Sequence, residues 1–328
     1  MNRLCLYYRP EPERDRWVPG DRFVRPIVRR LLRGQPRPGG LDKVFINLRL
    51  GLDRLGLPYI VNLPFRQLHP TDRVAVLGCG RHCLDGYRQP NPIVAGIGLM
   101  THPSEWPTLC TDYPVVRYLQ HSAWCDAVYR PYFSEHCAIW PVGIDTDRWQ
   151  PAPAAAKTTD FLLYDKIHWD HAGRETTLLA PLHAELARHG CSHETLRYGS
   201  YQPGDFQAAL GRCRAMIFLS AHESQGIAAQ EAMASGVPLL AWDPGFVEDP
   251  DRFQWGQAVI PATSVPYFDA RCGLTFHDAA EFAAQLPVFL ARLRAGQLTP
   301  RAYILENLTL EKCARHFVDL VNFAPPAP

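Results

Sequence analysis

The chain has 328 residues, of which 47% are apolar, so it is long enough for two domains with substantial cores. Its formal net charge of +1 gives no reason to expect nucleic acid as a partner. No apolar run has the length of a membrane-spanning helix, and residues 1–16 lack the pattern of a signal peptide. We therefore expect a cytoplasmic protein whose ten scattered cysteines are reduced thiols.

The first part of the chain alternates short apolar runs with polar turns, which is typical of a parallel α/β sheet. An amphipathic helix is predicted over 41–55. The segment 9–40 before it contains nine arginines, four acidic residues and six prolines, so we expect a long loop with a short helix at 23–32. This arginine-rich loop is either a surface excursion or a contact for a phosphate-bearing or lipid-linked acceptor. Strands are predicted at 4–8, 59–62, 73–77, 93–97 and 115–119.

Two cofactor interpretations of the first part fail on spacing. Gly78-Cys79-Gly80 begins like a dinucleotide fingerprint, but Cys83 stands where the third glycine belongs and no acidic partner follows. Cys79, His82 and Cys83 do not have the spacing of a zinc site, and no second pair of ligands follows. We therefore expect neither a nicotinamide cofactor nor a metal.

The second part repeats the α/β pattern after an Ala/Pro-rich linker at 151–157. We predict two domains, 1–150 and 151–309, with the final helix 310–323 packing back onto the first. The segment 243–269 is irregular and is a candidate part of the acceptor cleft, and 264–269 has no assigned role. Strands are predicted at 160–164, 194–198, 216–219 and 237–242, and helices at 176–189, 206–213, 227–235, 279–295 and 310–323.

The stretch from Ala215 to Pro244 indicates a ligand site. It reads as a buried strand, a polar loop, a short helix and a second strand, which is a βαβ unit. Ligands of such sheets bind at the carboxyl ends of strands, where helix N-termini present free N–H groups. The loop His222-Glu223-Ser224-Gln225-Gly226 occupies that position, and Glu231 follows Glu223 after seven intervening residues.

This stretch resembles the signature E-x-F-G-[LI]-x-x-x-E-A-M-A-x-G-x-P of the retaining GT-B glycosyltransferases, in the family-4-like group. The chain reads ESQGIAAQEAMASGVP from Glu223 to Pro238, with Gln225 where the family usually carries Phe. Residues 138–151 likewise resemble the family segment V-x-P-N-G-[IV]-D-x-x-x-F-x-P, with Val142 in place of Asn. The resemblance implies an α/β GT-B fold, with two Rossmann-like parallel-sheet domains facing each other across a cleft.

The implied activity is retaining transfer of a hexosyl or N-acetylhexosaminyl group from a UDP- or GDP-linked donor to an acceptor hydroxyl. Glu231 would bind the ribose diol and Glu223 the hydroxyls of the transferred sugar, through charge-assisted hydrogen bonds. The N–H groups of Gly226 and Ile227 would meet the diphosphate. Ser224 and Gln225 would line the same loop.

Further site residues follow from the same resemblance. The family holds the diphosphate with basic residues after the first strand of the second domain; Lys166 is the first choice and Arg174 the second, although the usual G-R-x-x-x-x-K-G arrangement is absent. An N-domain histidine lies near the donor sugar in the family. His102 is the better match and His121 the alternative, and a purely structural role stays open for both. Gly39-Gly40 fit the family's glycine-rich loop.

These assignments require no cofactor, because Lys166 and Arg174 would supply positive charge without a divalent metal. The expected partners are a nucleotide-sugar donor and a saccharide, lipid-linked or small-molecule acceptor, and peripheral contact with the inner membrane face stays open. Two alternatives also stay open. One is a noncatalytic nucleotide-sugar-binding or scaffold protein; the other is a retaining phosphorylase, which Glu231 and the lack of a lysine suited to pyridoxal disfavour.

Overall fold

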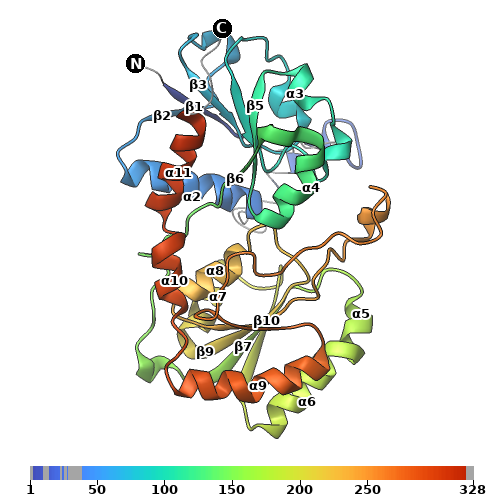
Figure 1. Ribbon diagram of the computed structural model, residues 1–328, viewed down its shortest axis with the longest axis vertical. Helices are drawn as coiled ribbons and strands as arrows, with labels where there is room; N and C mark the ends of the chain where they lie inside the picture. The colour runs from blue at the N-terminus through green and yellow to red at the C-terminus, as the bar shows by residue number, and fades with distance from the viewer. Residues whose placement is uncertain (1–2, 10–14, 23, 26–27, 29–38, 323–328) are drawn as a thin grey trace.

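The computed structural model describes residues 3–9, 15–22, 24–25, 28 and 39–322. Within them the chain forms two parallel sheets, one of six strands and one of five, each covered by helices and stacked along the long axis of the molecule (Figure 1). We call the sheet of β1–β6 with its helices the first unit, and that of β7–β11 the second unit.

The first unit has the strand order β2-β1-β3-β4-β5-β6. Apolar residues cover both faces of its strands, as expected for a parallel sheet between helices. Helix α2 covers one face together with the last helix of the chain, and α4 covers the other. The elements are β1 Leu4–Tyr7, α2 Gly40–Arg54, β2 Tyr59–Val61, β3 Arg73–Val76, β4 Ile93–Gly96, α3 Leu109–Asp112, β5 Val115–Gln120, α4 Ala123–Phe133 and β6 Cys137–Ile139.

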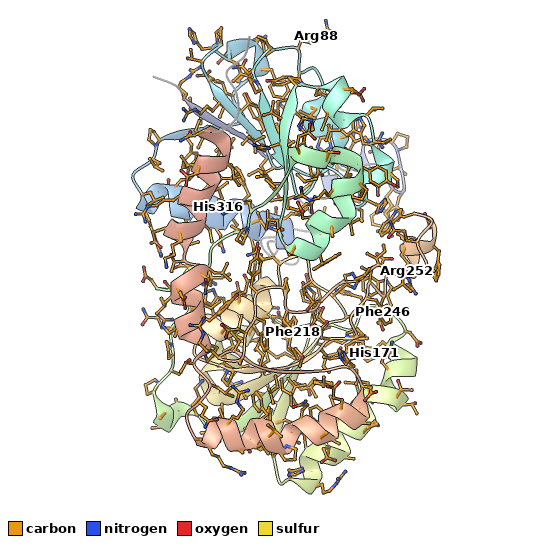
Figure 2. The ribbon with its side chains drawn as sticks, in the orientation of Figure 1. Arg88, His171, Phe218, Phe246, Arg252 and His316 are labelled. Carbon is orange, nitrogen blue, oxygen red and sulfur yellow. The ribbon has the colours of Figure 1, made fainter. Side chains whose placement is uncertain are left out.

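The second unit has the order β11-β10-β9-β7-β8. Its central strand β9 is fully buried from Ala215 to Leu219, and Phe218 lies in the interior of the unit (Figure 2). The elements are β7 Thr159–Asp165, α5 His171–Arg174, α6 Ala180–Arg188, β8 His193–Arg197, α7 Pro203–Arg212, β9 Cys213–Leu219, α8 Ile227–Ala234, β10 Leu239–Trp242, β11 Gly273–Phe276, α9 Ala279–Arg294, α10 Pro300–Asn307 and α11 Leu310–Asn322.

Short turns complete the architecture. A π-helical turn at Glu175–Leu179 joins α5 to α6. The 3₁₀ turns are η1 Phe65–Gln67, η2 Arg81–Leu84, η3 Pro103–Glu105, η4 Ser134–His136, η5 Ala154–Ala156 and η7 Pro250–Phe253. None of the helices in the described ranges is long and apolar enough to cross a membrane. All ten cysteines are free.

The predicted strands and most predicted helices are present, with shifts of a few residues at their ends. The short helix predicted at 23–32 falls mostly outside the described residues. Strands β6 and β11 and helices α3, α5 and α10 were not predicted. Strand β11 has only four residues, begins with Gly273 and gives a weak pattern, and α10 begins at Pro300, where we expected a break.

The segment between the units is fixed by α11. The Trp140 side chain is fully buried, donates from Nε1 to the Cys313 carbonyl at 2.9 Å and packs against Phe317. Gly143 lies so close to α11 that a Cβ atom there would be 2.4 Å from the Leu310 Cα. The last helix therefore packs against α2 of the first unit, although α10 before it contacts α8 of the second.

We expect Gly143→Ala to destabilise the protein by about 1–3 kcal/mol, because the added methyl group collides with backbone that cannot rotate away. The measurement is urea unfolding followed by circular dichroism. Gly211→Ala is the control, since its Cβ meets open space inside α7 and should be neutral or stabilise by about 0.5–1 kcal/mol. Equal midpoints for both variants would contradict the close approach.

Candidate functional site

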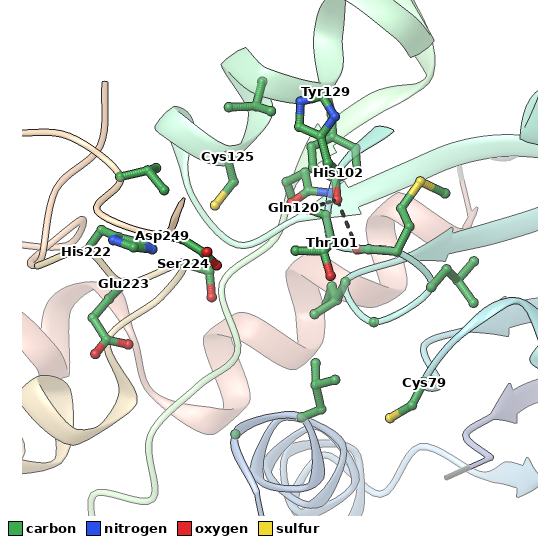
Figure 3. Close-up of a pocket in the computed structure, with 18 of the residues that line it drawn as sticks. Cys79, Thr101, His102, Gln120, Cys125, Tyr129, His222, Glu223, Ser224 and Asp249 are labelled. Atoms are coloured by element: carbon green, nitrogen blue, oxygen red, sulfur yellow. Dashed lines mark hydrogen bonds between the residues drawn. The ribbon is translucent and has the colours of Figure 1, made fainter. Parts of the chain in front are cut away.

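The carboxyl ends of both sheets face one cavity of about 1010 Å³ between the units. Figure 3 shows His222, Glu223, Ser224 and Asp249 on the side of the second unit, opposite Thr101, His102 and Gln120 of the first. The lining residues are Tyr8, Gly39–Asp42, Cys79–Arg81, Ile97–His102, Glu105, Gln120, Trp124, Cys125, Val128, Tyr129, Lys166, His168, Trp169, His222–Ser224, Val247, Asp249, Trp255 and Ile260.

Glu223 is held in the cavity wall by contacts from both units. Its Oε1 accepts hydrogen bonds from Lys166 Nζ at 2.5 Å and from Ser220 Oγ at 2.8 Å. Its backbone N–H donates to the Thr263 carbonyl, and its own carbonyl accepts from Trp124 Nε1 of α4. The structure therefore brings the two predicted site residues Glu223 and Lys166 together, and they form an ion pair with each other.

The loop after Glu223 leads into the N-terminus of α8. Gly226 has a φ of 79°, a left-handed conformation that costs glycine little and lets Ile227 begin the helix. Gln225 turns away from the cavity: its buried amide donates to the Val142 carbonyl at 2.6 Å and accepts from the Val142 N–H at 2.8 Å. Its side chain thus fixes the loop to the segment joining the units, and it is Ser224 that lines the cavity.

Glu231 lies on α8 with 5% of its surface exposed and does not line the cavity. Both of its carboxylate oxygens accept from Lys43 Nζ of α2, at 2.8 and 3.0 Å. Burial raises the pKa of Glu231, and the positive charges of Lys43 and Arg148 oppose that rise. Our sequence analysis missed Lys43, because it stands inside a regular amphipathic helix with no motif around it.

Arg174, the second choice for the diphosphate, is not brought to the cavity. Its guanidinium forms an ion pair with Glu248 and stacks over the Trp242 ring, 5.0 Å from the ring centre. Burial raises the pKa of Glu248, and Arg174 opposes that rise. Of the two basic candidates, only Lys166 lines the cavity.

The two candidate histidines differ in position. His102 lines the cavity, caps the turn at Pro103–Glu105 through Ser104, and stacks on Trp255 with the ring centres 4.7 Å apart. Its Nε2 is buried without a hydrogen-bond partner among the described residues, and burial lowers its pKa. His121 lies outside the cavity lining and donates from Nδ1 to the Trp140 carbonyl.

Trp255 belongs to an arm, residues 244–262 between β10 and β11, which reaches from the second unit to the first. Phe246 and Arg252 mark its course in Figure 2. Val247 and Ile260 of the arm form an apolar cluster with Trp124 and Val128 of α4. The sequence analysis named this irregular segment as a candidate part of the acceptor cleft, and the arm forms one side of the cavity.

A second aromatic contact that the sequence did not reveal adjoins Glu223. The rings of Trp169 and His222 stack with centres 5.1 Å apart, and Trp124 meets His222 edge-on. Burial lowers the pKa of His222 to about 4, and it lowers that of His121 to about 4 as well. Both rings are therefore neutral in the folded protein at neutral pH.

The lowered pKa values of His222 and His121 predict that the folded protein loses stability as the pH falls. In the unfolded chain a histidine binds a proton near pH 6.5, so below that pH the unfolded state holds more protons than the folded state. Stability should be complete above pH 6.5 and fall towards pH 4, by up to about 1.4 kcal/mol per pH unit for each histidine. Urea midpoints between pH 7.5 and 5.0 measure it. The decline should be shallower in His222→Gln and unchanged in His316→Gln, whose imidazole is exposed; parallel curves would contradict the prediction.

Two parallel α/β units with a cavity at facing carboxyl strand ends define the GT-B fold of glycosyltransferases. Residues 163–249, which include Glu223 and Glu231, match the family model "Glycosyl transferases group 1". The segment that carries these two glutamates is thus similar to this group of glycosyltransferases. Among the described residues, no group of three His, Cys, Asp or Glu side chains is arranged to hold a metal ion.

Solved structures with the same fold have low sequence identity to the chain. AviGT4, a glycosyltransferase involved in avilamycin A biosynthesis, is 16% identical with a TM-score of 0.57, over 99% of this chain and 98% of its own. The lipopolysaccharide outer core galactosyltransferase WaaB is 12% identical with a TM-score of 0.55, over 98% and 99%. TarM of S. aureus, solved with UDP, is 10% identical with a TM-score of 0.56, over 85% of this chain and 59% of its own. No curated protein sequence matches the chain significantly.

Proposed function

We propose that the chain transfers a hexosyl or N-acetylhexosaminyl group from a UDP- or GDP-linked donor to a hydroxyl of a saccharide or lipid-linked acceptor. The position of Glu223 carries this proposal. It stands in the cavity wall at the carboxyl end of β9, directly before the N-terminus of α8, with a lysine on one carboxylate oxygen. One loop thus presents a carboxylate for sugar hydroxyls beside N–H groups for phosphate.

Each part of the donor has a counterpart on this loop and helix. The diphosphate would lie at the N–H groups of Gly226 and Ile227, with Lys166 neutralising charge on the departing nucleotide. The transferred sugar would face Glu223, and the ribose would reach Glu231 further along α8. The two glutamates bind and orient; they do not form the acid and nucleophile pair of a glycosidase. The leaving phosphate would accept the proton of the acceptor hydroxyl.

The acceptor would lie against the wall of the first unit. That wall carries polar groups among its apolar ones: the Tyr8 hydroxyl donates to Asp42 at 2.6 Å, beside Gly39-Gly40 at the start of α2. Hydroxyl-rich acceptors suit such a wall, and WaaB is an outer core lipopolysaccharide enzyme. We propose accordingly that residues 1–150, with α11, form the acceptor side and residues 151–309 the donor side.

A screen of nucleoside diphosphates by thermal shift and calorimetry tests the proposal. UDP or GDP should raise the melting temperature, because a ligand that binds only the native state stabilises it. UMP and GMP, which lack the second phosphate, should raise it less. Binding of none of these nucleotides would contradict the donor assignment. Binding without nucleotide release from any UDP- or GDP-sugar, tested with a panel of saccharide acceptors, would favour the noncatalytic alternative.

A further inference from the structure

The contact between Lys43 and Glu231 joins the two units directly beside the cavity. Lys43 lies on α2 of the first unit and Glu231 on α8 of the second, 188 residues apart in sequence. The ammonium donates to both carboxylate oxygens, at 2.8 and 3.0 Å. Both oxygens of the Glu231 carboxylate thus accept a hydrogen bond from a residue of the first unit.

Little of that carboxylate is accessible in this arrangement. The Glu231 side chain is 6% exposed, whereas that of Lys43 is 39% exposed. Glu231 does not line the cavity, although Glu223 on the same loop and helix does. A ribose diol binds a carboxylate best through both oxygens, and both oxygens here accept from Lys43.

We propose that the Lys43–Glu231 ion pair is a gate on the nucleotide site, which the donor opens by displacing Lys43 from Glu231. This inference rests on the proposed function, in which Glu231 binds the ribose. The ammonium and the diol compete for the same two oxygens, so the structure corresponds to the closed state of the gate.

The surroundings of the pair allow this exchange. The half-exposed lysine can move its ammonium into water on a flexible four-carbon stem, so releasing it does not strand a buried charge. Arg148 adds positive charge near Glu231, which helps keep the carboxylate ionised after Lys43 leaves. Gln225 holds the start of α8 to Val142, so the loop keeps its place while the Lys43 side chain moves.

The ion pair should lower the apparent affinity for the nucleotide. Any contact that must break before the ligand binds weakens the apparent affinity by the free energy of that contact. We therefore expect Lys43→Met, which keeps the length of the stem and removes the charge, to bind the nucleoside diphosphate about tenfold more tightly than wild type. Lys43→Arg, which keeps a cation opposite Glu231, should bind more weakly than Lys43→Met.

The test is isothermal calorimetry with UDP and GDP on the full chain, at one ionic strength. Lys312→Met on α11 is the matched control and should bind as wild type does, because the Lys312 ammonium donates to the Glu306 carbonyl and does not line the cavity. Unchanged or weaker binding by Lys43→Met, with wild-type binding intact, would overturn the gate alone. If neither wild type nor Lys43→Met binds a nucleotide, the proposed function fails and the gate fails with it.

Discussion

Glu223→Gln is expected to lower kcat by about 100- to 1,000-fold. Positive charge develops on the transferred sugar as its bond to phosphate breaks, and Glu223 places a negative charge at that wall of the cavity. The amide has the same shape and still accepts from Ser220 and Lys166, so the fold and the loop should be preserved. The nucleotide should bind as well as to wild type or better, because Lys166 loses its carboxylate partner.

Steady-state release of nucleoside diphosphate at saturating donor and acceptor measures this effect. The control is Glu194→Gln. Glu194 lies on β8, does not line the cavity and pairs with Arg212 of α7, so its replacement should leave kcat unchanged. Circular dichroism and the melting temperature confirm that each variant is folded. A kcat for Glu223→Gln within a few-fold of wild type would remove this residue from the reaction.

Glu231→Gln is expected to weaken nucleotide binding by about 10- to 100-fold, because an amide makes weaker hydrogen bonds to a diol than a carboxylate does. The substitution also weakens the contact with Lys43, and this offsets part of the loss of affinity. A second ligand separates the two effects. Wild type should bind UDP or GDP more tightly than the corresponding 2′-deoxynucleotide, and Glu231→Gln should discriminate little between them.

Calorimetric titration of both nucleotides into both proteins gives the four dissociation constants that this comparison needs. The discrimination ratio does not depend on Lys43, since Lys43 is displaced equally in both titrations. Equal discrimination by wild type and Glu231→Gln would place the ribose elsewhere. Glu185→Gln is a suitable control, because Glu185 is also buried and paired, but on α6 with Arg188 and His189.

Much of the fold follows from local sequence. The strands β3, β4, β7 and β9 are short apolar runs bounded by turns, and this pattern depends only on neighbouring residues. The loop and helix that carry Glu223 and Glu231 are equally local, since a strand, a polar turn with Gly226 and a helix that stops before Gly236 follow each other directly. The contacts of these glutamates with Lys43 and Trp124 are not local, so no sequence pattern around the glutamates indicates them.

The partners come from distant segments. Lys43 reaches Glu231 across 188 residues, and Trp124 of α4 reaches the Glu223 carbonyl across 99. The arm carrying Trp255 shows no helical or strand periodicity in its sequence. Its apolar residues pack on α4, which is distant in the sequence. Arg174 shows the opposite case. Its position after β7 suited a phosphate ligand, but Glu248, 74 residues away, holds it outside the cavity.

A crystal structure of the protein with bound UDP or GDP tests the central claim most directly. The account predicts the diphosphate at the N–H groups of Gly226 and Ile227 with Lys166 nearby, and the ribose hydroxyls on Glu231 with Lys43 displaced. Nucleotide density in another part of the cavity, with the ribose away from Glu231 and Lys43 still paired to it, would contradict the account.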